Sequence, residues 1–108
     1  MTVKELSEKL SLEILAQGDL EREVTGCYSG DLLSWVMSKA QPGDAWLTVM
    51  GNINAVAVAV LTDCACIILT ENAALDDVAQ MKAVLQGVTF LRSDRNAYEL
   101  SVAISKLL

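Results

Sequence analysis

Hydrophobic positions near the start of the chain recur at helical spacing. Thr2 followed by Glu5 matches a capping box, in which each side chain accepts a hydrogen bond from the other residue's backbone. Apolar side chains then follow every three or four positions, at Val3, Leu6 and Leu10. This pattern predicts an amphipathic helix that opens the chain.

Short apolar runs and helical patterns alternate along the rest of the sequence. Runs bounded by turn residues predict strands at residues 12–16, 24–28, 45–50, 64–69 and 88–91. Helical spacing predicts helices at residues 31–40, 52–63 and 76–86, and a last helix capped by Asp94. The positions expected to face the sheet are Leu32, Leu33, Val36, Met37 and Ala40; Val78, Met81 and Leu85; and Ala97, Leu100, Ile104 and Leu107.

Residues 52–63 allow two interpretations, because the alternating Ala and Val residues from Ala55 to Val60 are apolar throughout. Valine favours a strand by propensity. However, Asn52 or Asn54 can cap a helix, and parallel strands on either side of this segment need a crossover connection. We therefore predict a helix.

The order of these elements predicts the fold class. Strands followed by helices at intervals of about twenty residues are typical of parallel strands joined by right-handed crossovers. We expect an α/β fold, layered α/β/α, with a mostly parallel sheet of about five strands. A chain of 108 residues without repeats or a flexible linker fits a single domain over residues 1–108.

Composition narrows the chemistry that such a domain can carry. The chain has 14 acidic and 8 basic residues, a formal net charge of −6, and no histidine. The absence of histidine removes the commonest general base and the commonest transition-metal ligand. The acidic balance disfavours nucleic acid and anionic membranes, which are bound through Lys and Arg. We therefore expect a protein that is not an enzyme and has neither a nucleic-acid nor a membrane partner.

Three cysteines, Cys27, Cys64 and Cys66, are the remaining candidates for metal chemistry. Their odd number argues against a disulfide framework. Cys64 and Cys66 are expected on the same face of a strand, but an iron–sulfur cluster usually takes four cysteines. We interpret the three as small hydrophobic residues and expect no metal and no other cofactor within one chain. A site shared between two chains stays open.

The N-terminal residues lack the basic start and apolar run of a signal peptide, which predicts a cytoplasmic protein. The longest apolar stretch, residues 53–69, is marginal in length for a bilayer and contains Asp63. No transmembrane helix is therefore expected.

Residues 21–34 (EREVTGCYSGDLLS) resemble the signature of the DRTGG domain family, which is named after its Asp, Arg, Thr, Gly and Gly. Glu21 stands at the Asp of the signature and Cys27 at its second Gly, whereas the other three residues agree. Residues 58–63 (VAVLTD) resemble the second recognisable block of the family. The resemblance covers nearly the whole chain.

The resemblance implies an α/β fold similar to the N-terminal domain of HPr kinase/phosphorylase. Domains of this family occur beside CBS domains in phosphotransacetylases and regulated pyrophosphatases, where their role is regulatory and dimerising. Stand-alone relatives from anaerobic bacteria and archaea are often labelled iron–sulfur-binding hydrogenase proteins. That label implies a partner enzyme of anaerobic metabolism.

The segment before the second predicted helix is a candidate ligand-binding site. It contains Arg22, Thr25, Gly26, Ser29 and Asp31. Hydroxyls at Thr25 and Ser29, just before a helix N-terminus, would attract a phosphate group. In the alternative, structural interpretation, Asp31 caps the helix and Arg22 pairs with Asp31 or with the preceding glutamate.

Two apolar features indicate a candidate dimer interface. Trp35 is expected to point away from the apolar stripe of its helix, so either a neighbouring segment covers it or a second subunit does. The predicted helix at residues 52–63 is apolar on every side, and only one side can face the sheet. The interface candidates are Trp35, Ala55, Val56, Ala59 and Val60.

Asp63 is a further polar residue in an apolar context. It could bind a cation or act as a base, but aspartate at such a position more often turns or caps the chain. We expect the second role.

Three functional hypotheses follow. The first is a non-enzymatic regulatory or assembly module that homodimerises and modulates or scaffolds a partner enzyme. The second is a sensor domain for a nucleotide or a phosphorylated metabolite. The third is an iron–sulfur or hydrogenase accessory subunit.

Overall fold

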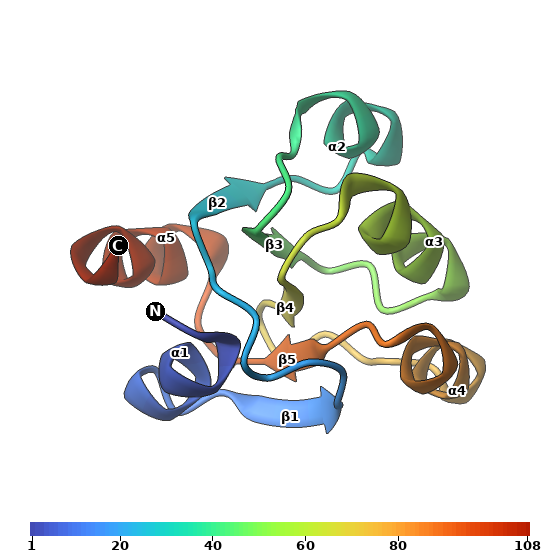
Figure 1. The fold of residues 1–108 in the computed structure, drawn as a ribbon, viewed down its shortest axis with the longest axis horizontal. Coiled ribbons are helices and arrows are strands. Elements are labelled where there is room, and N and C mark those ends of the chain that lie inside the picture. The colour runs from blue at the N-terminus through green and yellow to red at the C-terminus, as the bar shows by residue number, and fades with distance from the viewer.

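Five strands and five helices alternate along the computed structural model, which describes residues 1–108 (Figure 1). The helices are α1 (Val3–Lys9), α2 (Leu33–Lys39), α3 (Ile53–Thr62), α4 (Asp77–Gln86) and α5 (Ala97–Leu107). The strands are β1 (Glu13–Ala16), β2 (Gly26–Ser29), β3 (Asp44–Thr48), β4 (Cys66–Leu69) and β5 (Phe90–Arg92). Every predicted element is present, with its ends moved by a few residues.

The five strands form one sheet in the order β1-β5-β4-β3-β2. Strands β2 to β5 are parallel to their neighbours, and β1 runs antiparallel to β5 at one edge. Trp46 of β3 lies opposite Tyr28 of β2 and Ile67 of β4. The mostly parallel sheet confirms the predicted α/β class.

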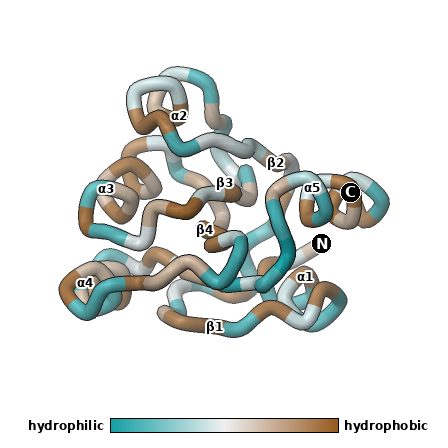
Figure 2. Tube along the Cα trace, turned by 180° about the vertical axis from the view of Figure 1, so that it is seen from behind, coloured by the Kyte–Doolittle hydropathy of each residue, from teal (hydrophilic) through white to brown (hydrophobic).

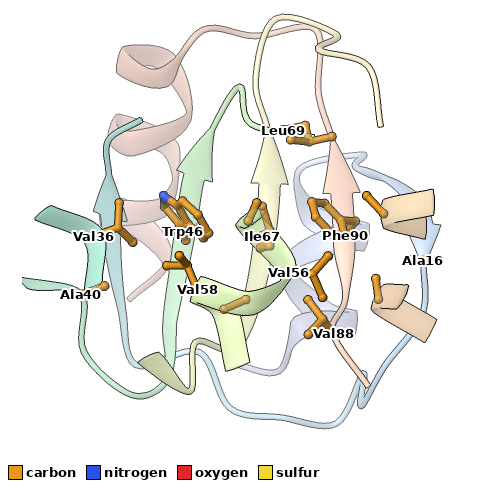
Figure 3. Close-up of a cluster of buried hydrophobic side chains, with 14 residues drawn as sticks. Ala16, Val36, Ala40, Trp46, Val56, Val58, Ile67, Leu69, Val88 and Phe90 are labelled. Carbon is orange, nitrogen blue, oxygen red and sulfur yellow. The ribbon is translucent and has the colours of Figure 1, made fainter. Parts of the chain in front are cut away.

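Helices cover both faces of the sheet and bury two hydrophobic clusters. The three-helix layer (α2, α3 and α4) lies on one face and the two-helix layer (α1 and α5) on the other (Figure 1). Alternate side chains of a strand point to opposite faces. Those facing the three-helix layer are Trp46, Ile67 and Phe90 (Figure 3). Those facing the two-helix layer are Leu47, Ile68 and Leu91.

Capping boxes fix the first turns of α1 and α5. In α1, Thr2 and Glu5 bond to each other's backbone as predicted. The predicted cap of α5 is wrong, because Asn96 and not Asp94 occupies that position. Asn96 accepts from the backbone of Glu99, whose carboxylate accepts in return from the backbone of Asn96. This reciprocal pair needs an acid three residues after the cap, which Asp94 does not have.

The Ala/Val segment forms α3, which confirms the helix prediction. Asn52 caps it by accepting from the backbone N–H of Ala55, and Asp63 ends it in the left-handed conformation with φ of 55°. Asp63 therefore turns the chain between α3 and β4, as expected. No helix in the structure has both the length and the apolarity needed to cross a membrane.

Helix α4 faces the sheet with the side opposite to the predicted one. Its buried residues are Ala79 and Ala83, whereas Val78, Met81 and Leu85 are exposed. Residues 79 and 83 have the same four-residue spacing as 81 and 85, so periodicity alone cannot choose between the stripes. The small alanines let the helix backbone approach the sheet closely. The larger apolar residues Val78, Met81 and Leu85 are left on the outside. Figure 2 shows hydrophobic stretches along the backbones of α3 and α4.

Helix α2 also differs from the predicted pattern. Val36 and Ala40 are buried and Leu33 is partly buried, as expected, but Leu32 and Met37 are exposed. Leu32 precedes the helix as its N-cap residue, so it does not follow the helical stripe. The apolar residues of this segment are thus divided between the core and the surface.

Candidate functional site

The five candidate ligand-binding residues are divided between opposite edges of the sheet. Arg22 and Thr25 precede β2 and Gly26 begins it, near the amino ends of the parallel strands. Ser29 ends β2 and Asp31 follows it, at the carboxyl ends. A four-residue strand is about 13 Å long, so these residues do not surround one ligand. The predicted single anion site is therefore not assembled in this chain.

Arg22 is paired with Asp63, which lies 41 residues further along the chain. Its Nη1 and Nη2 donate to Oδ1 and Oδ2 of Asp63 at 2.9 and 3.1 Å, and Nη2 also donates to the Asp63 carbonyl at 3.0 Å. This guanidinium lowers the pKa of the Asp63 carboxyl from its ordinary value, and Asp63 raises the pKa of Arg22. The predicted partners of Arg22, Asp31 and the preceding glutamate, are wrong. The pair instead links the two segments, residues 21–34 and 58–63, that carry the family resemblance.

Thr25 and Gly26 join the start of β2 to the start of β3. Thr25 donates its backbone N–H to the Gly43 carbonyl at 3.0 Å. A β-carbon at position 26 would lie 2.5 Å from Oδ1 of the buried Asp44, whose Oδ2 accepts from the backbone N–H of Gln41 at 2.8 Å. Glycine at position 26 therefore leaves space for the Asp44 carboxylate, which favours a structural role.

Asp31 connects two loops at the carboxyl ends of β2 and β3. Its Oδ1 accepts from the Thr48 hydroxyl at 2.7 Å and from the Val49 backbone N–H at 2.9 Å. The predicted capping of α2 by Asp31 is wrong, because Leu32 is the N-cap residue and forms no side-chain capping bond. Ser29 is exposed at the end of β2.

Arg22 and Asp63 line a small cavity at the amino ends of β4 and β5. Its volume is about 190 Å³, and Asp19, Cys64 and Gln86 also contribute to its wall. Small-molecule pockets usually enclose about 300 to 1,000 Å³. Because the cavity is small and its arginine is already paired, it is a weak candidate for ligand binding.

Cys64 and Cys66 point to opposite faces of the sheet, contrary to prediction. Cys64 lies before β4 and packs against the cluster of the three-helix layer, whereas Cys66 begins β4 and is buried in the other cluster. The left-handed turn at Asp63 precedes Cys64, which is why the alternation of a regular strand does not apply to it. Burial raises the pKa of the Cys64 thiol to about 11 and raises that of Cys66 further. No group of three or more Cys, Asp or Glu side chains has the arrangement of a metal site.

The candidate dimer residues also divide into two groups. Ala55, Val56 and Ala59 are buried in the core of the chain itself, so their assignment to an interface is wrong. They point toward the sheet because the inner stripe of α3 falls on them. Val60 is 48% exposed and Trp35 is 56% exposed. The Lys39 ammonium lies over the Trp35 ring, 4.0 Å from its centroid, and α1 lies on the other side of the sheet.

The sequence indicated the apolar character of α3, but not that α4 extends it into a larger apolar surface. We call it the apolar outer face, and its residues are Ile53, Val60, Leu61, Val78, Met81, Val84 and Leu85. A groove of about 550 Å³ lies between the two helices, and it is lined by Ile53, Val60 and Leu61 from α3 and by the polar side chains of Lys82 and Gln86 from α4. The signal was present in the spacing of Val78, Met81 and Leu85, which sequence analysis assigned to the core.

Comparisons with known proteins show the fold. No family model and no curated protein matches the sequence. Among solved structures, the chain is similar to the CBS and DRTGG domains of the regulatory region of Clostridium perfringens pyrophosphatase, crystallised with its activator diadenosine tetraphosphate. The TM-score is 0.80 at 13% sequence identity. The match covers 99% of this chain and 47% of that structure. The chain therefore has a DRTGG-type fold, as the resemblance implied.

Proposed function

We propose that this DRTGG-type chain is a non-catalytic regulatory or assembly module that homodimerises through its apolar outer face and modulates or scaffolds a partner enzyme. The similarity to a regulatory region supports the regulatory part of the proposal. The observation that carries it is the exposure of large apolar side chains on α3 and α4.

These side chains are exposed to an extent that is unusual for a cluster. Leu85 is 79% exposed, Leu61 73% and Met81 67%. Single exposed apolar residues are ordinary, but several large ones on two neighbouring helices are typical of an interaction surface. Burial of such surface gains about 25 cal/mol per Å². A partner that covers this face would therefore be bound with a hydrophobic driving force.

The charge distribution favours a second copy of the chain as that partner. The chain carries a net charge of −6, so two copies repel each other over most of their surfaces. Helix α3 has no charged residue, and the groove beside it contains a single charge, the cation Lys82. The groove is thus a region where two acidic chains can meet without opposing carboxylates, and the nearest acidic residue of α4 is Asp77 in its first turn.

The shape of the face also suits a two-fold contact. Ala57 lies in the groove on α3, whereas Met81 lies on the neighbouring helix α4. In a two-fold dimer both copies use the same patch, so α3 and α4 of one copy contact α3 and α4 of the other.

The expected contact area extends beyond α3 and α4. A stable dimer buries at least about 500 Å² per copy, roughly a tenth of the 5550 Å² surface of one chain. Two ten-residue helices side by side present a flat area of roughly 15 by 20 Å. We propose that the contact also includes α2, which packs beside α3 and carries the exposed Trp35.

The test is the mass of the chain in solution at tens of micromolar concentration. We expect a mass near twice the 11.6 kDa of one chain by sedimentation or light scattering. Met81→Glu should give a monomer, because a charge would be buried in the apolar contact. The matched control is Tyr98→Glu, at a 77% exposed position of α5 on the other layer, which should stay dimeric. A monomeric wild type, or a dimer that survives Met81→Glu, would overturn the proposal.

A further inference from the structure

A polar groove of about 310 Å³ lies at the carboxyl ends of β4 and β5, away from the apolar outer face. Asn72 comes from the loop after β4, and Arg92, Ser93, Asp94 and Arg95 come from the end of β5 and the loop that follows. Ser11, between α1 and β1, closes the third side. The groove corresponds to the volume of about ten water molecules, which is enough for a small metabolite.

The position of this groove is where parallel α/β sheets bind ligands. After β4 the chain crosses to α4 in the three-helix layer, whereas after β5 it crosses to α5 in the two-helix layer. Ligands of open α/β sheets bind beyond the carboxyl ends of the strands. The groove lies beyond the carboxyl end of β5, next to the start of β1.

The groove contains two arginines, Arg92 and Arg95, and two carboxylates, Glu13 and Asp94. Two of the three arginines of the sequence line it. Arg92 is fixed by Glu13, whose Oε1 accepts from Nε and Nη2 of Arg92 at 3.2 and 2.9 Å. The guanidinium of Arg95 makes no hydrogen bond or ion pair within the chain. Arg95 is thus a free planar donor beside a groove, which suits phosphate or carboxylate oxygens.

The backbone around the groove is fixed in uncommon conformations. Ser11, Glu71 and Asn72 have φ values of 54°, 55° and 54°, and they are three of the four non-glycine residues with positive φ. The two loops are joined by hydrogen bonds from the Glu71 N–H to the Arg95 carbonyl and from the Asn72 N–H to the Ser93 carbonyl, both 2.9 Å. Such conformations cluster where a structure positions functional groups.

We propose that this groove binds a small phosphate ester that carries hydroxyl groups, of the size of a sugar phosphate. Arg95 binds the phosphate, and Arg92, which is paired with Glu13, supplies a second hydrogen-bond donor. Asp94, whose carboxylate has no ion-pair partner in the chain, accepts hydrogen bonds from the ligand's hydroxyls. A bare anion would be repelled by Asp94, so the combination of an arginine and a free carboxylate selects a ligand with both kinds of group.

The test is a titration of the isotope-labelled chain with ribose 5-phosphate, followed by proton–nitrogen correlation NMR. We expect saturating shifts at the amides of Asn72 and of residues 93–96. Arg95→Gln should weaken binding about tenfold or more, because a charge-assisted bond is lost. Asp94→Asn should weaken ribose 5-phosphate but strengthen inorganic phosphate, and ribose alone should not bind measurably. Lys82→Gln, with the same change of charge on the other layer, should bind as the wild type does.

The spectra also show whether each variant is folded, so a loss of binding cannot be mistaken for unfolding. Absence of saturating shifts with ribose 5-phosphate would overturn the proposal, as would equal affinity in Arg95→Gln or weaker binding of inorganic phosphate in Asp94→Asn. The titration is repeated on Met81→Glu. Binding that persists in this variant separates the groove from dimerisation, so either proposal can fail without the other.

Discussion

The two helical layers bury similar cores but present different surfaces. The cluster under the three-helix layer has 14 buried residues and that under the two-helix layer has 13. Toward solvent, α1 presents the charged residues Lys4, Glu5, Glu8 and Lys9. In contrast, α3 and α4 present the apolar outer face. The two-helix layer covers its core as fully as the three-helix layer does, although α1 has a charged exterior. The exposed leucines and Met81 are therefore not required for folding, and association with a second chain explains them better.

The largest effect expected from this comparison is that of Leu100→Ala in α5. Leu100 is fully buried, and removing its side chain should cost about 3 kcal/mol through lost burial and a cavity. For a domain of this size the melting temperature should fall by on the order of 15 °C. Leu85→Ala, at an exposed position of α4, should change the free energy of unfolding of the monomer by less than about 0.5 kcal/mol.

Both variants are measured by urea unfolding in the Met81→Glu background, which removes any contribution from a dimer. Without the Met81 substitution, the urea midpoint of a dimer rises with protein concentration. This rise should be smaller for Leu85→Ala than for the unsubstituted chain. Equal losses from Leu85→Ala and Leu100→Ala in the monomer would mean that α4 is packed against something within the chain, contrary to the structure.

An intermediate effect is expected at the helix caps, which differ little between the layers. Asn52 caps α3 by accepting from Ala55, and Asn96 caps α5 by accepting from Glu99. Replacement of either asparagine by alanine should cost about 1 kcal/mol, because one backbone N–H loses its acceptor. Similar losses in urea unfolding would show that the layers differ in their outward side chains and not in how their helices are stabilised. A neutral Asn52→Ala would contradict this view.

Local patterns in the sequence were sufficient to predict the order of the elements, the fold class and several of the caps. Thr2 with Glu5 and Asn52 with Ala55 are interactions between residues three apart, so the sequence contains them directly. The prediction was wrong where two nearby residues could each cap the same helix, as with Asp94 and Asn96 before α5.

Interactions between distant segments could not be predicted in this way. The partner of Arg22 lies 41 residues away and is brought near by the turn after α3. The buried stripe of α4 was misassigned because Ala79 and Ala83 repeat with the same period as larger residues. Ala55 was likewise placed in an interface because an entirely apolar helix does not indicate which side faces the sheet. The groove at Arg95 depends on three segments that only the sheet order brings together.

The smallest expected effect is the pH dependence of the tie between α3 and the segment before β2. Arg22 lowers the pKa of Asp63 below its ordinary value of 3.8, so the ionised pair stabilises the fold above that pH, and the contribution is lost as pH falls through the lowered pKa. Both side chains are substantially exposed, which screens the pair, and its contribution should stay well under about 1 kcal/mol.

Asp63→Asn keeps a residue that tolerates the left-handed turn. The difference in melting temperature between wild type and Asp63→Asn should therefore be small and positive at neutral pH and shrink below pH 3.8. Glu21→Gln, which removes a carboxylate with no ion pair, is the matched control and should show no such trend. A difference that grows toward acid would mean that the pair does not stabilise this end of the three-helix layer.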